Sequence, residues 1–243
     1  MDREKLHSKV ELFQTGGEIS YSKDASVAKF LLGGLGTGNI AVGPRGELRD
    51  WEIFNWPGKG QFVPFSFFAI WTKEEGKEPV SRILESKICP PYYQSHGFLN
   101  GELAGIPRFE ESKMVGKQPF VYVDLKDSKV PVQVSMEAYT PFIPLNADDS
   151  GIPTAIIKYK VKNPTNKPVD VSVAGTMANV VGFDGYDVFN NVKLVDEVQN
   201  EYKEENGMKG WYYTAKNLKE TDMKFGSMSI VTTNQNQVSK KKW

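Results

Sequence analysis

The sequence has a single cysteine, little histidine, no net charge and no long apolar segment. Cys89 is the only cysteine among 243 residues, so an intrachain disulfide and a cluster of thiolate metal ligands are both excluded. No apolar segment follows the charges of Met1–His7, so we expect no signal peptide. No stretch reaches the roughly 20 apolar residues of a transmembrane helix. These features together predict a cytoplasmic protein without a membrane span.

The charge balance argues against a polyanionic partner. Lysine plus arginine and aspartate plus glutamate each number 30, so the formal net charge is zero. A neutral chain lacks the basic surface that nucleic acid or an anionic membrane requires. The one basic run, Lys240–Lys242, lies at the end of the chain, where a frayed terminus explains it. We therefore expect no nucleic-acid partner.

What the sequence does have is a hydrophobic pattern that repeats every two residues, which is typical of half-buried strands. The pattern is clearest in Pro131–Tyr139, where valine, methionine and alanine alternate with polar residues. It recurs in Thr154–Lys162 and, after the polar turn Asn163–Pro168, in Val169–Val173. Two such segments around a short turn predict an antiparallel hairpin.

The remaining segments extend the same interpretation. Further strands are predicted at Asn39–Val42, Glu47–Phe54, Pro64–Thr72, Phe120–Leu125, Gly210–Ala215 and Gly226–Thr233. In the third of these, one predicted core face consists of Phe65, Phe67, Ala69 and Trp71. Helical signals are confined to Asp196–Asn206 and Asp24–Leu32, where a turn or a short helix is expected.

Many short strands, with 22 glycines and 14 prolines between them, predict an all-β fold. The expected architecture is an antiparallel β-sandwich of two packed sheets, with long loops and little helix. We divide the chain into a partly ordered N-terminal extension, residues 1–29, and a sandwich domain, residues 30–243. No further element is predicted after the final strand, so this domain is expected to be incomplete at its C-terminal end.

The glycine-rich segment Gly33–Gly38 predicts a tight turn that leads into a strand. It does not match the dinucleotide-binding spacing G-x-G-x-x-G, because the last glycine would fall on Ala41. It also lacks the G-K-[ST] ending of a P-loop. A phosphate site is therefore the weaker interpretation, and we expect no nucleotide or other cofactor.

Metal and nucleophile motifs are incomplete. Asn146–Gly151 opens like a calcium loop, but the twelfth position, which needs a bidentate glutamate, is Ile157. Local Asx-turn chemistry explains the segment without an ion. A Cys89–His96 pair has no third group to orient it. The sequence thus predicts neither a metal site nor a catalytic residue in this chain.

The stretch Arg45–Gly58 is the candidate contact region, with Arg49, Asp50, Trp51 and Trp56 as its candidate residues. Arginine, acids and tryptophan suit a sugar site, a buried interface with another domain, or a strand that packs Trp51 into the core. Glu47, Asp50 and Glu52 lie close together in the sequence and suggest a polar contact surface, but the pattern identifies no catalytic carboxylate pair among the 30 acidic residues. Strand alternation, however, sends Asp50 to the opposite side from Glu47.

A family resemblance rests on the order of several motifs. These are Gly33–Gly38, Arg45-Gly46, Trp51, Thr140–Pro144, Asp149–Pro153, the segment with Asn163 and Val169–Val173, and Asn179–Gly182. Together they make most of the chain from about Phe30 to Gly182 similar to the N-terminal domain of glycoside hydrolase family 116. That is the family of non-lysosomal glucosylceramidases and bacterial β-glucosidases.

The resemblance implies a β-sandwich that precedes an (α/α)6 catalytic barrel in a retaining β-glucosidase. In that family the catalytic acids belong to the barrel, so this chain is expected to be inactive alone. Its implied partners are the barrel and a β-glucoside held where the two domains meet. The alternative is a free-standing carbohydrate-binding sandwich that stacks sugars on Trp51, Trp56 or Tyr92-Tyr93. A structural or adhesion sandwich is the third hypothesis.

Overall fold

The computed structural model describes residues 10, 19–89, 103, 105–186, 192–194 and 197–240. Their regular structure is almost entirely strand, which confirms the predicted fold class. The strands are β1 (Ser20–Ser22), β2 (Phe30–Leu32), β3 (Asn39–Val42), β4 (Leu48–Glu52), β5 (Phe67–Glu74), β6 (Val80–Ser86), β7 (Arg108–Phe109), β8 (Glu111–Lys117), β9 (Phe120–Lys126), β10 (Gln133–Tyr139), β11 (Ile156–Lys162), β12 (Val169–Thr176), β13 (Phe183–Tyr186), β14 (Val192–Leu194), β15 (Val198–Glu205), β16 (Met208–Ala215) and β17 (Met228–Thr232). A single helical turn, α2, spans Ala147–Ser150. Over the described ranges, no helix has the length and apolar character to cross a membrane.

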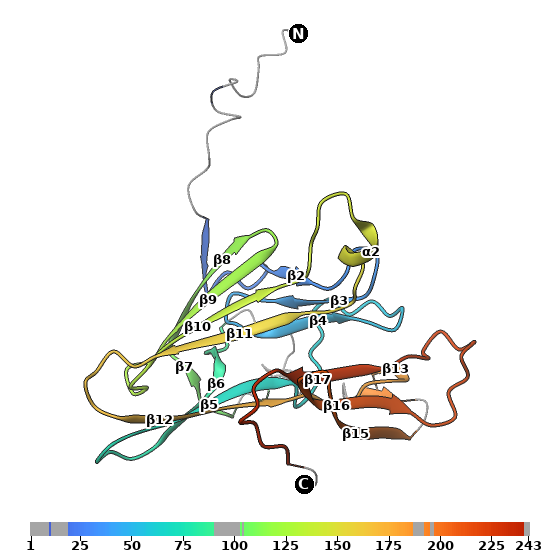
Figure 1. Ribbon diagram of the computed structural model, residues 1–243. Coiled ribbons are helices and arrows are strands. Elements are labelled where there is room, and N and C mark those ends of the chain that lie inside the picture. Colours follow the sequence, from blue (N-terminus) through green and yellow to red (C-terminus); the bar gives the residue numbers. More distant parts are fainter. Residues whose placement is uncertain are drawn as a thin grey trace.

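Two sheets form the main layers, and the core lies between them (Figure 1). One has the strand order β1-β8-β9-β10-β11 and the other β12-β5-β6-β7. Smaller sheets, β2-β3-β4, β13-β14 and β15-β16-β17, lie beside these layers. Both large sheets, together with β2 and β3, contribute to one apolar cluster, whose buried members are Leu32, Val42, Ile70, Leu84, Phe109, Met114, Val121, Val123, Leu125, Val130, Val132, Val134, Met136 and Ala138.

The alternation predicted from the sequence is clearest in β10. Val134, Met136 and Ala138 are buried, and the polar residues between them are more exposed. β9 and β11 pair with β10 on its two sides, so its inward side chains meet neighbours in the same layer. β1, which lies inside the predicted extension, pairs with β8 and widens this sheet at its other edge.

The predicted hairpin of β11 and β12 is wrong. β11 pairs with β10, and β12 pairs with β5 in the other sheet. The connection Asn163–Pro168 therefore carries the chain from one layer to the other, and the Asn163 side chain donates a hydrogen bond to the carbonyl of Lys167 within it. Alternation identifies the buried face of a strand but not its neighbour, so both arrangements fit the same pattern.

The predicted core face of β5 is also wrong. Ile70 and Thr72 are buried and face the core, whereas Trp71 on the opposite face is 36% exposed. Phe65, the first residue of the predicted aromatic face, precedes the strand and is exposed. Both phases of this segment carry apolar residues, since Phe68 packs against the core cluster. The large aromatic side chains therefore pointed to the wrong face of the strand as the buried one.

The two segments expected to form turns or short helices contain strands. Residues 198–205 form β15, which pairs along its whole length with β16. Its residues are mostly polar and exposed, so the sequence has no apolar alternation from which to recognise a strand. In the other segment, turns over residues 23–27 lead into β2. With three residues, this strand is too short to show an alternation of apolar and polar side chains.

Candidate functional site

The candidate region is the hairpin of β3 and β4 and the loop after it. A tight turn closes the hairpin, with the Gly46 amide donating to the Gly43 carbonyl at 3.0 Å and the Gly43 amide donating to the Glu47 carbonyl at 3.0 Å. The Glu47 carboxylate folds back over this turn and accepts the Arg45 amide at 2.9 Å. An added Cβ on Gly43 would lie 2.2 Å from Glu47 Oε1, so the carboxylate occupies the space that only glycine leaves.

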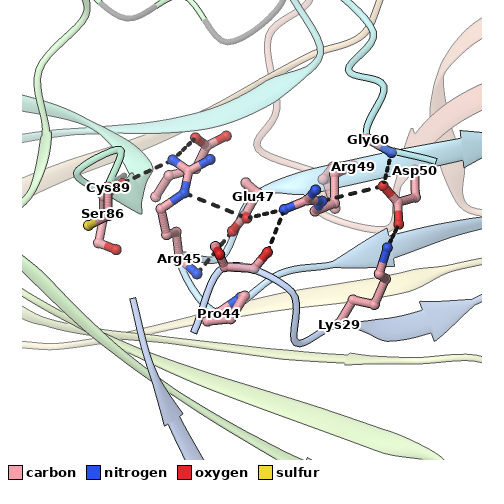
Figure 2. A network of polar contacts seen from close by, with 12 residues as sticks. Lys29, Pro44, Arg45, Glu47, Arg49, Asp50, Gly60, Ser86 and Cys89 are labelled. Atoms are coloured by element: carbon pink, nitrogen blue, oxygen red, sulfur yellow. Dashed lines mark hydrogen bonds and ion pairs between the residues drawn. The ribbon is translucent and has the colours of Figure 1, made fainter. Parts of the chain in front are cut away.

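From this turn a series of alternating charges runs through the interior (Figure 2). We call it the buried charge chain, and its members in order are Arg108, Glu85, Arg45, Glu47, Arg49, Asp50 and Lys29. Glu47 Oε1 lies 3.6 Å from Arg45 Nε and also 3.6 Å from Arg49 Nη1. Each acid in the chain thus lies between two cations, which offsets much of the free energy lost when these groups leave water.

At one end of the chain, Asp50 is completely buried in a left-handed backbone conformation, with φ of 51°. The Lys29 ammonium and the Gly60 amide donate hydrogen bonds to its carboxylate, the latter at 2.7 Å, and Arg49 Nε lies 3.4 Å away. Burial alone would raise the pKa of Asp50. The hydrogen bonds from Lys29 and Gly60 and the charge of Arg49 outweigh it and hold that pKa below its ordinary value.

At the other end, Glu85 of β6 lies between two arginines. Its Oε2 is 3.2 Å from Arg108 Nε and 3.8 Å from Arg45 Nη1. Burial raises the pKa of Glu85, and the two arginines oppose this rise only in part. Arg108 also donates to the carbonyls of Leu103 and Ile106, so it is tied to the backbone shortly before β7.

This arrangement is suited to holding elements together. A general acid or base must reach a substrate, whereas Glu47 and Asp50 are buried, Glu85 is mostly covered, and all three are paired with cations. A recess lined in part by Arg45, Glu85 and Arg108 has room for roughly one water molecule and none for a sugar ring. The buried charge chain joins β4, β6, β7, the turn before β4 and the residue that precedes β2.

The four residues predicted for contact lie in different environments. Arg49, Asp50 and Trp51 are buried, and Trp51 packs with Val63 and Val180 in a second apolar cluster. Trp56 alone is open to solvent, with 41% of its surface exposed, and its ring meets Phe183 edge-on at 5.7 Å. Contact of these four residues with a substrate or another domain stays a prediction, and Tyr92-Tyr93 and His96 lie outside the described residues.

Comparison with protein families bears directly on this fold. Residues 30–243 match the family model described as "beta-glucosidase 2, glycosyl-hydrolase family 116 N-term". The match covers most of the chain, including both large sheets except β1 and the whole buried charge chain except Lys29. The chain belongs to this family. The resemblance inferred from the ordered motifs is thereby confirmed.

In this family 116 N-terminal domain, sequence reasoning missed three members of the buried charge chain. Lys29, Glu85 and Arg108 are 21 to 40 residues away in sequence from the ion-pair partners that they have in the chain, Asp50 for Lys29 and Arg45 and Arg108 for Glu85. One signal was available. The stretch around β4 places charges in both phases of the strand, and a solvent-facing strand would place them in one.

Elsewhere in this domain, the other motifs have structural roles. Gly33–Gly38 forms the predicted turn into β3, with left-handed backbone at Gly36. Asn146 caps α2, where its side chain accepts the Asp149 amide, as Asx chemistry predicts. Across the described ranges, no three histidine, cysteine, aspartate or glutamate side chains converge as metal ligands would.

Substituting Asp50 with asparagine is expected to lower stability at neutral pH by about 1 kcal/mol. Asparagine tolerates the left-handed backbone and still accepts the Gly60 amide, so the change removes mainly the charge that Lys29 and Arg49 face. Because the pKa of Asp50 is depressed on folding, its stabilising effect is complete above the ordinary value of 3.8 and is lost as the pH falls through the folded value. Urea unfolding from pH 6 to pH 2.5 should therefore show a smaller acid loss in the variant. An equal loss in both proteins would contradict this assignment.

Proposed function

We propose that this domain is a non-catalytic supporting module of a retaining β-glucosidase of the glucosylceramidase type. Its partner in this proposal is an (α/α)6 catalytic barrel, with the β-glucoside bound where barrel and sandwich meet. The family match supports a glycoside hydrolase module, and the barrel and the supporting role are the proposed part. The single cysteine further supports a cytoplasmic enzyme.

The buried charge chain is the observation that carries this proposal. The acids of the most distinctive stretch, Glu47 and Asp50, are paired inside the domain and face no substrate-sized space. A glycosidase needs two accessible carboxyl groups, about 5–5.5 Å apart when it retains configuration. Residues that hold the fold together in this way suit a rigid support more than a reaction centre.

The alternative, a carbohydrate-binding sandwich, depends on Trp56. Burial of Trp51 in the second apolar cluster leaves its ring no free face for a sugar. Trp56 is partly exposed, and its ring packs edge-on against Phe183. A tryptophan fixed by a neighbouring ring presents a firm stacking surface, and this observation favours the alternative.

One set of assays separates these functions. The purified chain is expected to hydrolyse an aryl β-glucoside no faster than buffer, because the acids of its distinctive stretch are buried and paired. Hydrolysis at the rate of a complete family 116 enzyme would overturn the proposal. Titration with glucose and cello-oligosaccharides, followed by tryptophan fluorescence, is expected to give no shift. A saturable shift that Trp56→Ala abolishes would favour the carbohydrate-binding function instead.

A further inference from the structure

A fully exposed leucine stands at a turn position that ordinarily belongs to glycine or asparagine. Ile143, Pro144, Leu145 and Asn146 form a β-turn, closed by a hydrogen bond from the Asn146 amide to the Ile143 carbonyl at 3.0 Å. Pro144 occupies the second position and Leu145 the third, where φ is +66°. This matches a type II turn, whose third residue is normally Gly or Asn because other side chains are strained there. Burial does not offset this strain, because the Leu145 side chain is entirely exposed to solvent.

Hydrogen bonds from a buried serine fix the turn that carries Leu145. Ser150 is buried, and its hydroxyl accepts the Ile143 amide at 2.9 Å and donates to the Ile143 carbonyl at 3.1 Å. The Asn146 side chain caps α2 on the far side of the turn. A loop fixed by this many hydrogen bonds keeps the leucine in place, so its exposure is part of the folded structure.

A second loop adds to the same end of the sandwich. The Leu35 amide donates to the Ser150 carbonyl at 2.8 Å, and Gly34 packs directly on the backbone of Gly151. The Gly33 amide donates to Thr140 Oγ1 at 2.7 Å. Both loops lie beside α2 at one end of the molecule (Figure 1). Together they present five exposed apolar side chains, which we name the apolar end surface: Leu35, Phe142, Ile143, Leu145 and Ile152.

We propose that the apolar end surface is where this domain docks onto the catalytic half of its enzyme, with Leu145 as the central anchor. Exposed apolar side chains gathered in one place mark an interaction surface, and a rigid anchor lowers the entropy lost on binding. The proposal rests on the proposed function and names the surface that function requires. It moves the expected contact away from Arg49, Asp50 and Trp51, which are buried.

The occupant follows from the family and from the position of the surface. The matched family model is that of an N-terminal domain, so a catalytic half belongs to the same enzyme and meets this domain at high effective concentration. The two loops also contain three of the motifs through which the sequence resembles the family, Gly33–Gly38, Thr140–Pro144 and Asp149–Pro153. The surface lies on loops at the sandwich end and leaves the strand edges free, which argues against sheet extension by a second copy.

The test compares Leu145→Asn with Val27→Asn. Val27 is another highly exposed apolar residue, and it lies outside the apolar end surface. The probe is the catalytic half of a family 116 β-glucosidase, produced separately and checked by circular dichroism for helical folding. Titration calorimetry is expected to show binding by the unchanged chain and by Val27→Asn, and roughly 30-fold weaker binding by Leu145→Asn, as for a central anchor residue. Because asparagine suits the left-handed backbone, the Tm of Leu145→Asn alone should stay the same or rise.

The outcomes distinguish this docking surface from the supporting role on which it rests. If the unchanged chain binds the catalytic half and Leu145→Asn binds equally well, the docking surface is wrong and the supporting role stands. If the unchanged chain does not bind at all, both fail. A lower Tm for Leu145→Asn would mean that the leucine serves the fold, and this would also overturn the docking role. Sedimentation that shows self-association abolished by Leu145→Asn would assign the surface to a second copy.

Discussion

Replacement of Glu47 by alanine is expected to lower the free energy of unfolding by about 3–5 kcal/mol, because two buried arginines then lose the anion between them. Arg45 and Arg49 each lie 3.6 Å from the Glu47 carboxylate, and both are buried. The same carboxylate accepts the Arg45 amide in the hairpin turn, so the turn loses a hydrogen bond as well. Urea unfolding at pH 7, followed by tryptophan fluorescence, measures the loss.

Glu137→Ala is the matched control for this prediction. Glu137, on β10, also pairs with a cation, Lys158, at 3.3 Å, but both side chains reach solvent. An exposed ion pair contributes at most about 1 kcal/mol, so the control should change stability little. A loss below about 1 kcal/mol for Glu47→Ala would show that water replaces the carboxylate and that the buried charge chain contributes little to stability.

The contrast between these two glutamates shows what the sequence can predict. Alternation along β10 identifies Glu137 as a residue of a solvent-facing strand face, and the structure agrees. The same rule fails at β4, because its pairing with β3 contains an irregularity and Asp50 adopts a left-handed backbone. Simple alternation put Glu47 and Asp50 on opposite sides, and yet both carboxylates reach Arg49.

Strand pairing was beyond the sequence for a different reason. The pattern located β3, β9, β10, β11 and β16 within a few residues, most clearly for β9 and β10, each of which has one buried face. It could not show that the chain changes sheets after Lys162, since β11 and β12 face the same core from opposite layers. Pairing depends on contacts between distant segments, and these leave no local periodicity.

For the candidate site, too, the sequence showed the residues that are close together along the chain but not the distant ones. Its local part, Arg49 to Trp51, was visible as an unusual mixture of charge and aromatic residues. Its distant part was not, because Glu85 and Arg108 occupy ordinary strand segments far along the chain. The exposure of Leu145 was likewise invisible, since a Pro-Leu turn in sequence does not show whether the leucine points inward or outward.

Gly34→Ala is the second large effect, with an expected loss of about 3 kcal/mol in unfolding free energy. A Cβ at this position would lie 2.2 Å from the Gly151 carbonyl oxygen and 2.8 Å from that of Ile152. Both obstacles are backbone atoms, so neither can rotate away as a side chain would. The two loops would have to separate, and the hydrogen bond from Leu35 to Ser150 would be strained with them.

Gly36→Ala separates this overlap from backbone strain. Gly36 belongs to the same motif and has a φ of +72°, but an added Cβ there would meet no atom within 4 Å. Alanine at Gly36 should therefore cost only the left-handed backbone term, about 1–2 kcal/mol, whereas alanine at Gly34 disrupts the contact between the loops. Thermal and urea unfolding of the two variants measure the difference. Equal losses would mean that the glycines of this motif serve the turn alone, and that contact between the two loops contributes nothing to the stability of the domain.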